Sequence, residues 1–167
     1  MTQILLKKKI CMLGAFSVGK TSLVRQFVTT VFSEKYLTTV GVKVDKKHVS
    51  LETAEMDMLI WDIYGEDNLQ SVSLSYLRGA SGYLLVLDGT RKETLTIAKE
   101  IEEKIERTIG PLPSIVIINK SDIEDRWELT DDVINKTSEW GWRVFRTSAK
   151  TGEGVEEAFK VLAMSIC

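Results

Sequence analysis

Residues 14–21 of the chain read GAFSVGKT, which is the complete G-x-x-x-x-G-K-[ST] pattern. The apolar run at residues 10–13 predicts a buried strand before it, and the spacing of residues 21–28 predicts a helix after it. A glycine-rich turn in this setting presents successive backbone N–H groups to one anion, and the helix adds its positive end. The alternative, a plain glycine turn with a surface lysine, does not require the complete pattern. We therefore expect phosphates to be bound by Gly14, Ala15, Phe16, Ser17, Val18, Gly19, Lys20, Thr21 and Ser22.

Short apolar runs alternate with stretches of helical spacing along the rest of the chain. Continuous apolar runs indicate strands that are covered on both faces, as in a mostly parallel sheet between two layers of helices. The predicted fold is therefore α/β, with a six-stranded, mostly parallel sheet, helices on both faces and a hairpin turn at residues 52–55. We expect strands at residues 10–13, 40–51, 56–63, 83–87, 115–118 and 142–146, and helices at 21–28, 71–78, 94–109, 131–140 and 155–166.

Ligands of such sheets bind outside the carboxyl ends of the strands. In the first of these loops, Lys20 supplies a point charge for the β- and γ-phosphates and the Thr21 hydroxyl is placed for Mg²⁺. The strand at residues 56–63 carries Asp62 near its end, a candidate for a carboxylate that lies behind the direct ligands of Mg²⁺. Gly65 after it allows close backbone approach to a γ-phosphate. An ordinary strand-ending aspartate with a turn glycine is the alternative, and this motif alone leaves both open.

Residues 119–122 follow another predicted strand and read NKSD. The carboxylate of Asp122 can accept two hydrogen bonds from the N1–H and N2–H₂ edge of guanine, which adenine lacks. Asn119 can connect this loop to the phosphate-binding loop, and the Lys120 stem can lie over the base. Alone, the four residues would be only a polar loop, but their place after a strand favours base recognition.

The last predicted strand ends in residues 147–152, which read TSAKTG. Ser148 and the Ala149 N–H can reach the guanine O6, and Lys150 can pack beside the base. The alternative is a serine that caps the following helix, and the loop by itself leaves both readings open.

Composition narrows the class of protein. The chain has 167 residues, a length that predicts one domain over residues 1–167. It has 22 basic and 24 acidic side chains, and the resulting net charge of −2 argues against nucleic acid as a partner. Two cysteines exclude a disulfide framework and favour a reducing compartment, and no apolar run is long enough to span a membrane. We expect a cytoplasmic protein in which Cys11 is a core residue and His48 is exposed on a strand without a metal.

Together with these motifs, residues 36–41 (YLTTVG), 61–62 (WD) and 76–82 (YLRGASG) make the chain resemble a Ras-superfamily small GTPase of the Rab-like branch, over about residues 4–166. The resemblance implies the P-loop NTPase fold and a molecular switch that binds GTP and GDP with Mg²⁺ and hydrolyses GTP. It also implies that protein effectors and regulators contact two switch loops, at about residues 33–41 and 64–76.

The resemblance also assigns residues within these two loops. Phe32 matches an aromatic residue that contacts the guanine edge-on, and Tyr36 matches a tyrosine that closes over the phosphates. Thr39 matches the threonine that closes on Mg²⁺ and the γ-phosphate. The implied metal ligands are Thr21, Thr39 and Asp62, and the implied catalytic residues are Lys20, Thr39, Gly65 and Glu66.

Three residues depart from the family pattern. Phe16 and Tyr64 each stand where the family usually has a small residue, and Glu66 stands where it usually has a glutamine. These departures predict slow hydrolysis, and a module that binds GTP without hydrolysing it stays open as the alternative. An ATP-using kinase or ATPase is disfavoured by residues 119–122.

The C-terminal residue Cys167 does not form a C-a-a-X prenylation box. Membrane association is therefore expected only through a lipidated tail beyond residue 167. A prokaryotic-type relative without prenylation is the other reading.

Overall fold

The structure is a computed structural model, and it describes residues 3–28, 35–37, 42–63 and 74–167. A sheet of seven strands forms its centre: β1 (Leu5–Gly14), β2 (Lys35–Leu37), β3 (Val42–Ser50), β4 (Glu55–Ile63), β5 (Ala80–Asp88), β6 (Ser114–Asn119) and β7 (Val144–Arg146). The helices are α1 (Lys20–Phe27), α2 (Glu93–Thr108), α3 (Asp131–Lys136) and α4 (Val155–Ser165), with short 3₁₀ turns at η1 (Leu74–Leu77), η2 (Glu124–Arg126) and η3 (Thr137–Trp140).

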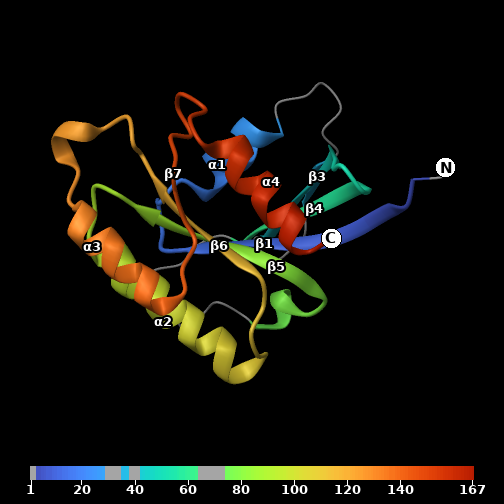
Figure 1. Cartoon of the computed structure of the whole chain (residues 1–167), viewed down its shortest axis with the longest axis horizontal. Helices are drawn as coiled ribbons and strands as arrows, with labels where there is room; N and C mark the ends of the chain where they lie inside the picture. Colours follow the sequence, from blue (N-terminus) through green and yellow to red (C-terminus); the bar gives the residue numbers. More distant parts are fainter. Residues whose placement is uncertain (1–2, 29–34, 38–41, 64–73) are drawn as a thin grey trace.

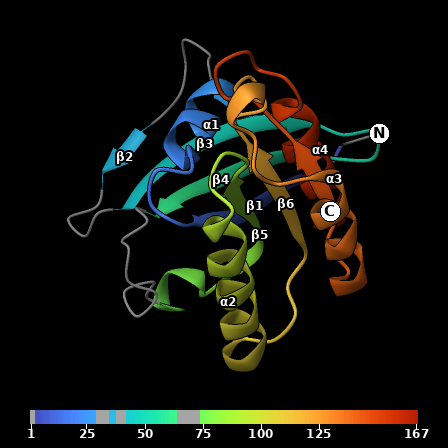
Figure 2. The same ribbon diagram turned by 90° about the vertical axis from the view of Figure 1, so that its left-hand side faces the viewer.

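The strands follow the order β2-β3-β4-β1-β5-β6-β7 across the sheet (Figures 1 and 2). Strand β1 runs parallel to β4 and β5, and β6 is parallel to both β5 and β7, whereas β3 is antiparallel to β4. The expected mostly parallel α/β sheet is thus confirmed. The difference is β2, a short edge strand antiparallel to β3, whose three residues are too few to show an alternating pattern in the sequence.

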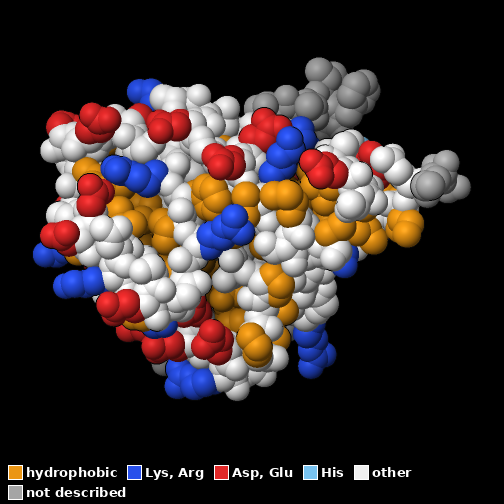
Figure 3. All heavy atoms as spheres, in the orientation of Figure 1, with side chains coloured by type: hydrophobic (Ala, Val, Ile, Leu, Met, Phe, Trp, Pro, Cys, Tyr) orange, Lys and Arg blue, Asp and Glu red, His pale blue; other side chains and the backbone are white. Residues whose placement is uncertain are grey.

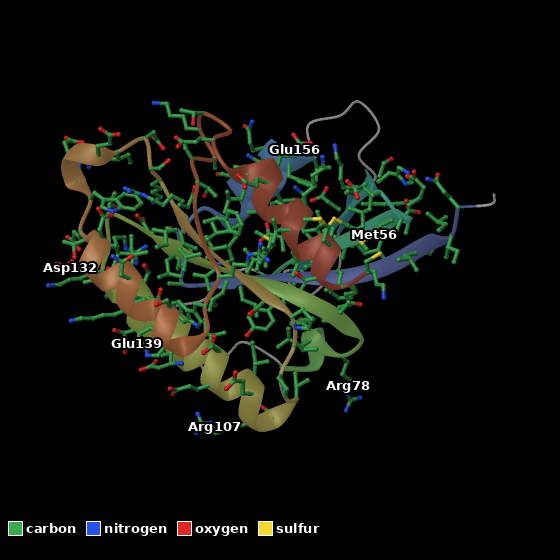
Figure 4. The ribbon with its side chains drawn as sticks, viewed as in Figure 1. Met56, Arg78, Arg107, Asp132, Glu139 and Glu156 are labelled. Atoms are coloured by element: carbon green, nitrogen blue, oxygen red, sulfur yellow. The ribbon has the colours of Figure 1, made fainter. Side chains whose placement is uncertain are left out.

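Two apolar layers separate the sheet from its helices. Helices α1 and α4 lie on one face and α2 on the other, as Figures 1 and 2 show from two directions. Successive residues of one strand serve opposite layers, because neighbouring side chains of a strand point to opposite faces: Met12 packs toward α1 and α4, and Leu13 toward α2. Met56 belongs to the first layer, while Arg107 and Glu156 point outward from their helices (Figure 4).

The helix predicted at residues 131–140 is shorter than expected. Helix α3 ends at Lys136 and continues as the 3₁₀ turn η3. The hydroxyls of Thr137 and Ser138 donate to the carbonyls of Ile134 and Asn135, three residues earlier in each case. Such side-chain bonds compete with the regular helical pattern, so the hydroxyl residues favour a tighter turn.

The surface in Figure 3 carries acidic and basic side chains interspersed, without a single-sign field on the face shown. Among the described residues, no helix combines the length and the apolar composition that crossing a bilayer would require.

The topology brings five strand ends to one edge of the sheet. Strands β1, β4, β5, β6 and β7 all run in the same direction, so their carboxyl ends meet there. The parallel arrangement thus places the carboxyl ends of these strands at one edge of the sheet, and this edge is where the candidate site lies.

The β3–β4 hairpin carries a charge cluster around His48. The Nδ1 of His48 lies 2.8 Å from Asp57 Oδ1, and its Nε2 lies 2.7 Å from Glu55 Oε2. The hydrogen bond with Asp57, followed by that with Glu55, raises the pKa of His48 above its ordinary value of 6.5, while burial acts in the opposite direction. The contribution of the His48 charge to stability is therefore fully present below pH 6.5, the unfolded value, and is lost as the pH rises through the raised pKa. The hydrogen bonds with His48 and Ser50 hold the pKa values of Asp57 and Glu55 below their ordinary values, so the contribution of these carboxylates is lost as the pH falls through the lowered values.

We predict that the ring-proton NMR signal of His48, the single histidine of the chain, titrates with a midpoint above 6.5. Asp57→Asn should lower this midpoint, because the stronger of the two carboxylate partners is lost. Glu52→Gln, in the exposed hairpin turn, is the matched control and should leave it unchanged. A midpoint at or below 6.5 in the parent protein would contradict the prediction.

Candidate functional site

The loop between β1 and α1 has the geometry of an anion cradle. Gly19, which precedes α1, adopts φ 102°, and a Cβ there would lie 2.3 Å from the Asn119 Nδ2, so only glycine fits this position. Within the described part of the chain, no backbone hydrogen bond outside the helices and strands uses an N–H group of residues 15–19. These donors are thus available to a ligand at the start of α1.

Two adjoining hollows form a groove along this edge. The first, about 390 Å³, is lined by Phe16, Ser17, Gly19, Lys20, Thr21, Ser22, Asp62 and Lys120. The second, about 320 Å³, is lined by Gly19, Ser22, Asn119, Lys120, Asp122, Ile123, Ala149 and Lys150. Because three lining residues are common to both, the hollows are continuous, with lysine and hydroxyl groups in one and the Asp122 carboxylate in the other.

Lys20 lies beneath the loop and is 6% exposed. Its Nζ donates to the carbonyls of Gly14, at 3.0 Å, and Ala15, at 2.9 Å. Burial lowers the pKa of Lys20 to about 8, and the charge of Asp62 acts in the opposite direction. The ammonium is thus a poorly solvated cation at the floor of the cradle, where an anion would stabilise it.

Thr21 and Asp62 place two side-chain oxygens beside Lys20. The Thr21 hydroxyl donates to Asp62 Oδ2 at 2.6 Å, while Asp62 Oδ1 is buried and has no hydrogen-bond partner among the described residues. Burial raises the pKa of Asp62, against the hydrogen bond from Thr21 and the charge of Lys20. Mg²⁺ is usually held by one or two protein oxygens together with phosphates and water, so these two residues fit that ion.

Asn119 joins three segments of the site. Its Nδ2 donates to the Val18 carbonyl at 3.0 Å, and its Oδ1 accepts from the Thr147 hydroxyl and the Ala149 N–H at 3.2 and 3.1 Å. The side chain is 1% exposed, so a replacement without an amide would leave several buried polar groups unsatisfied.

Lys120 spans the phosphate loop and the loop after β5. Its Nζ donates to the Ser17 carbonyl at 3.0 Å and to Asp88 Oδ2 at 2.6 Å. Burial opposes the charge of Asp88, yet the hydrogen bonds from Lys120 and Thr90 hold its pKa below the usual range. The lysine stem is thereby fixed across the groove at the junction of the two hollows.

Asp122 is oriented by its neighbour across the groove. The Ser148 hydroxyl donates to Asp122 Oδ1 at 2.7 Å and accepts from the Thr151 N–H at 3.1 Å. The Ala149 N–H donates to Asn119, so neither of the groups expected to meet a guanine O6 is free in this structure. Ser148 therefore acts here on the direction of the Asp122 carboxylate, while Ala149 and Lys150 line the hollow beside it.

The structure brings together the expected residues of the phosphate loop, Asp62 and the two base loops. Phe32, Thr39, Gly65 and Glu66, together with Tyr64, lie outside the described residues. Tyr36 belongs to β2, where the course of the backbone alone is described.

Two residues of this edge, Asp88 and Arg91, were not predicted as site residues. Asp88 is fully buried and fixes Lys120, and Arg91 Nη1 donates to the Phe16 carbonyl at 2.9 Å. The sequence feature that could have identified them is their position, because both lie at or just after the carboxyl end of β5, on the edge that holds the candidate site.

Comparison with known proteins agrees with this arrangement. The model of one protein family, described as the Ras family, matches residues 9–167. Ras-related protein Rab-7b of Mus musculus is 33% identical over 159 residues, which cover 93% of this chain and 80% of the relative. Ras-related protein ralB-B of Xenopus laevis is 36% identical over 155 residues, 90% of this chain and 75% of the relative. Ras-related protein Rab-13 of Canis lupus familiaris is 30% identical over 160 residues, 95% and 79% of the two chains.

Proposed function

Because the chain belongs to the Ras family of small GTPases, we propose that its groove holds GTP or GDP with the phosphates at residues 14–21 and the guanine at Asp122. Membership of this family makes the protein a nucleotide-binding switch with GTP hydrolase activity. The observation that carries the residue assignments is the chemistry of the groove: free N–H groups and a buried lysine at one end, and an oriented carboxylate at the other.

Phosphate binding rests on the loop N–H groups and Lys20. A phosphate oxygen near Lys20 would compete with the carbonyls of Gly14 and Ala15 for its ammonium. The anion has the advantage of a full negative charge, since charge-assisted hydrogen bonds are about twice as strong as neutral ones.

Guanine selection rests on Asp122. A carboxylate held by Ser148 presents its remaining lone pairs in a fixed direction, which suits the two adjacent N–H donors of guanine. Adenine offers no such pair, so binding it would desolvate the carboxylate without compensation, at a cost of about 1–3 kcal/mol or more.

Mg²⁺ would be held by Thr21 and Asp62, with Thr39 as the ligand contributed by the first switch loop. When bound, the ion offsets charge that develops on the phosphate oxygens. Lys20 adds a second positive charge, and Thr39 and Gly65 position groups at the γ-phosphate for in-line attack by water.

Hydrolysis is proposed to be slow. Phe16 lines the phosphate end of the groove and is 56% exposed, so its ring occupies space that a smaller residue would leave for a water-orienting side chain or an inserted arginine. Glu66, when ionised, only accepts hydrogen bonds, whereas a glutamine both donates and accepts. A module that signals by GTP occupancy alone is the second candidate that these two residues support.

The partners proposed are protein effectors and regulators that contact residues 33–41 and 64–76. In a nucleotide switch, contacts to the γ-phosphate and Mg²⁺ order such loops, and hydrolysis releases them. The surface that a partner binds would thus exist chiefly in the GTP-bound protein.

The direct test is the nucleotide content of the purified protein. We expect about one guanine nucleotide per chain, measured by chromatography of the released nucleotide, and displacement of labelled GDP by GTP but not by ATP. Displacement by ATP at comparable concentration would reject the guanine assignment and favour an ATP-using enzyme.

Asp122→Asn should weaken GTP binding by about tenfold to a hundredfold, because a charged acceptor for two donors is lost. The same variant should improve binding of xanthosine triphosphate, whose ring carries a carbonyl in place of the amino group. Competition against labelled GDP measures both. Asp125→Asn, an exposed aspartate in η2, is the matched control, and unchanged GTP affinity in Asp122→Asn would show that the base binds elsewhere.

Lys20→Ala and Thr21→Asn should weaken binding through different interactions. Lys20→Ala should reduce GDP and GTP affinity by about tenfold or more whether or not Mg²⁺ is present, because a charge contact is lost. Thr21→Asn should reduce GTP affinity more than GDP affinity, and only in the presence of Mg²⁺. Titrations with and without EDTA measure this, with the exposed Lys136→Ala as control. Equal losses that do not depend on Mg²⁺ in Thr21→Asn would reject its role.

Single-turnover hydrolysis tests the proposed rate. The parent protein should be slow, and the Phe16→Gly, Glu66→Gln double variant should be about tenfold faster or more, because water orientation by an amide is restored. Phosphate release from preloaded GTP is the measurement. A fast parent that slows when Glu66 becomes glutamine would identify Glu66 as a working catalytic residue, and no release at all would favour signalling by occupancy.

A further inference from the structure

We propose that Arg91 is a positioning residue for nucleotide binding, which fixes the phosphate loop from outside the groove by holding the Phe16 carbonyl. The inference rests on the proposed function, because it concerns the affinity of the same loop for phosphates. Arg91 lies just beyond the carboxyl end of β5, and its Nη1 donates to the Phe16 carbonyl oxygen at 2.9 Å.

Three successive peptide groups of the loop are held in the same manner. Arg91 binds the carbonyl of Phe16, Lys120 that of Ser17, and Asn119 that of Val18. In a planar trans peptide, the C=O of one residue and the N–H of the next point in opposite directions. The three contacts therefore fix the directions of the N–H groups of residues 17, 18 and 19, which have no backbone acceptor in the described part of the chain.

Ser17 shows why the loop needs such contacts. Its φ is 60°, one of two left-handed non-glycine conformations in the described backbone. A residue with a side chain pays about 1–2 kcal/mol for this region, so the loop on its own favours other conformations. Arg91 and Lys120 hold the carbonyls on the two sides of this residue, at Phe16 and at Ser17 itself.

Arg91 is itself held in place. Its Nε donates to Glu93 Oε1 at 3.1 Å, and its backbone N–H donates to the Asp88 carbonyl at 3.0 Å. The Thr94 hydroxyl donates to the Arg91 carbonyl at 2.7 Å. The side chain is 34% exposed, but the planar guanidinium makes both of its contacts at once, which the single ammonium of a lysine does not match.

A cation on the Phe16 carbonyl also polarises its peptide group, which strengthens the Ser17 N–H as a donor. Arg91 thus assists the binding of the phosphates that lie against the loop, without touching them. A nucleoside monophosphate, which lacks the β- and γ-phosphates, should depend on this contact far less than a diphosphate or triphosphate.

The test compares Arg91→Ala with Lys92→Ala, which removes the same charge from the adjacent exposed residue. In competition against labelled GDP, Arg91→Ala should weaken GDP and GTP by a similar factor of about ten, the loss typical of a hydrogen bond from a charged group. GMP affinity should stay near that of the parent. Arg91→Lys, which keeps the charge but not the fork, should lie between parent and Arg91→Ala, and Lys92→Ala should match the parent.

A double-mutant cycle with Ser17→Gly shows whether Arg91 acts through the loop conformation. Glycine adopts φ 60° without strain, so Arg91→Ala should cost less in the Ser17→Gly background than in the parent. Additive costs would overturn the proposal, as would a loss for GTP alone, which would mean direct contact with the γ-phosphate. Failure of the parent protein to bind GDP would reject the proposed function itself, whereas a parent that binds GDP as tightly as Arg91→Ala does would reject only the role of Arg91.

Discussion

The amide of Asn119 binds the Val18 carbonyl, the Thr147 hydroxyl and the Ala149 N–H, and the geometry of the candidate site depends on this buried side chain. It joins loops that follow β1, β6 and β7, which the sheet brings to one edge. The close approach requires a glycine at position 19, since any Cβ would occupy the space of the amide nitrogen. The best-known feature of the sequence, the glycine-rich stretch, is thus shaped partly to receive a residue a hundred positions later.

The same edge gathers charges that would be costly elsewhere. Lys20, Asp62 and Asp88 are each buried, and each has at least one close polar partner: loop carbonyls for Lys20, the Thr21 hydroxyl for Asp62, and the Lys120 ammonium for Asp88. Burying a charge without a partner is strongly unfavourable, so these contacts stabilise the charges beside the proposed phosphate site. The half of the groove proposed to bind phosphates is therefore lined by buried charges with polar partners and by oriented backbone, and the half proposed to bind the base by one oriented carboxylate.

The succession of strands along the chain and the positions of the loops that follow them could be predicted, because their signals are local. The run at residues 10–13, the stretch GAFSVGKT and the loop at residues 119–122 each identify themselves within a few positions. Strand β2 could not be predicted, because three residues show no periodicity, and α3 was overestimated because the helical pattern does not reveal the competing hydroxyls of Thr137 and Ser138. Asp88 and Arg91 were missed for another reason: their importance lies in contacts with Lys120 and Phe16, which only the fold brings together.

The two carbonyl contacts of Lys20 have a consequence for nucleotide exchange. Because the ammonium can rest on Gly14 and Ala15, departure of a phosphate does not leave a buried cation without a partner. With the phosphates bound as proposed, these carbonyls would compete with the phosphates for the ammonium of Lys20, which would lower the net free energy gained from phosphate binding. A nucleotide switch must both bind its nucleotide and release it. Lys20 would serve both steps, because its ammonium can bind either the phosphates or the carbonyls of Gly14 and Ala15.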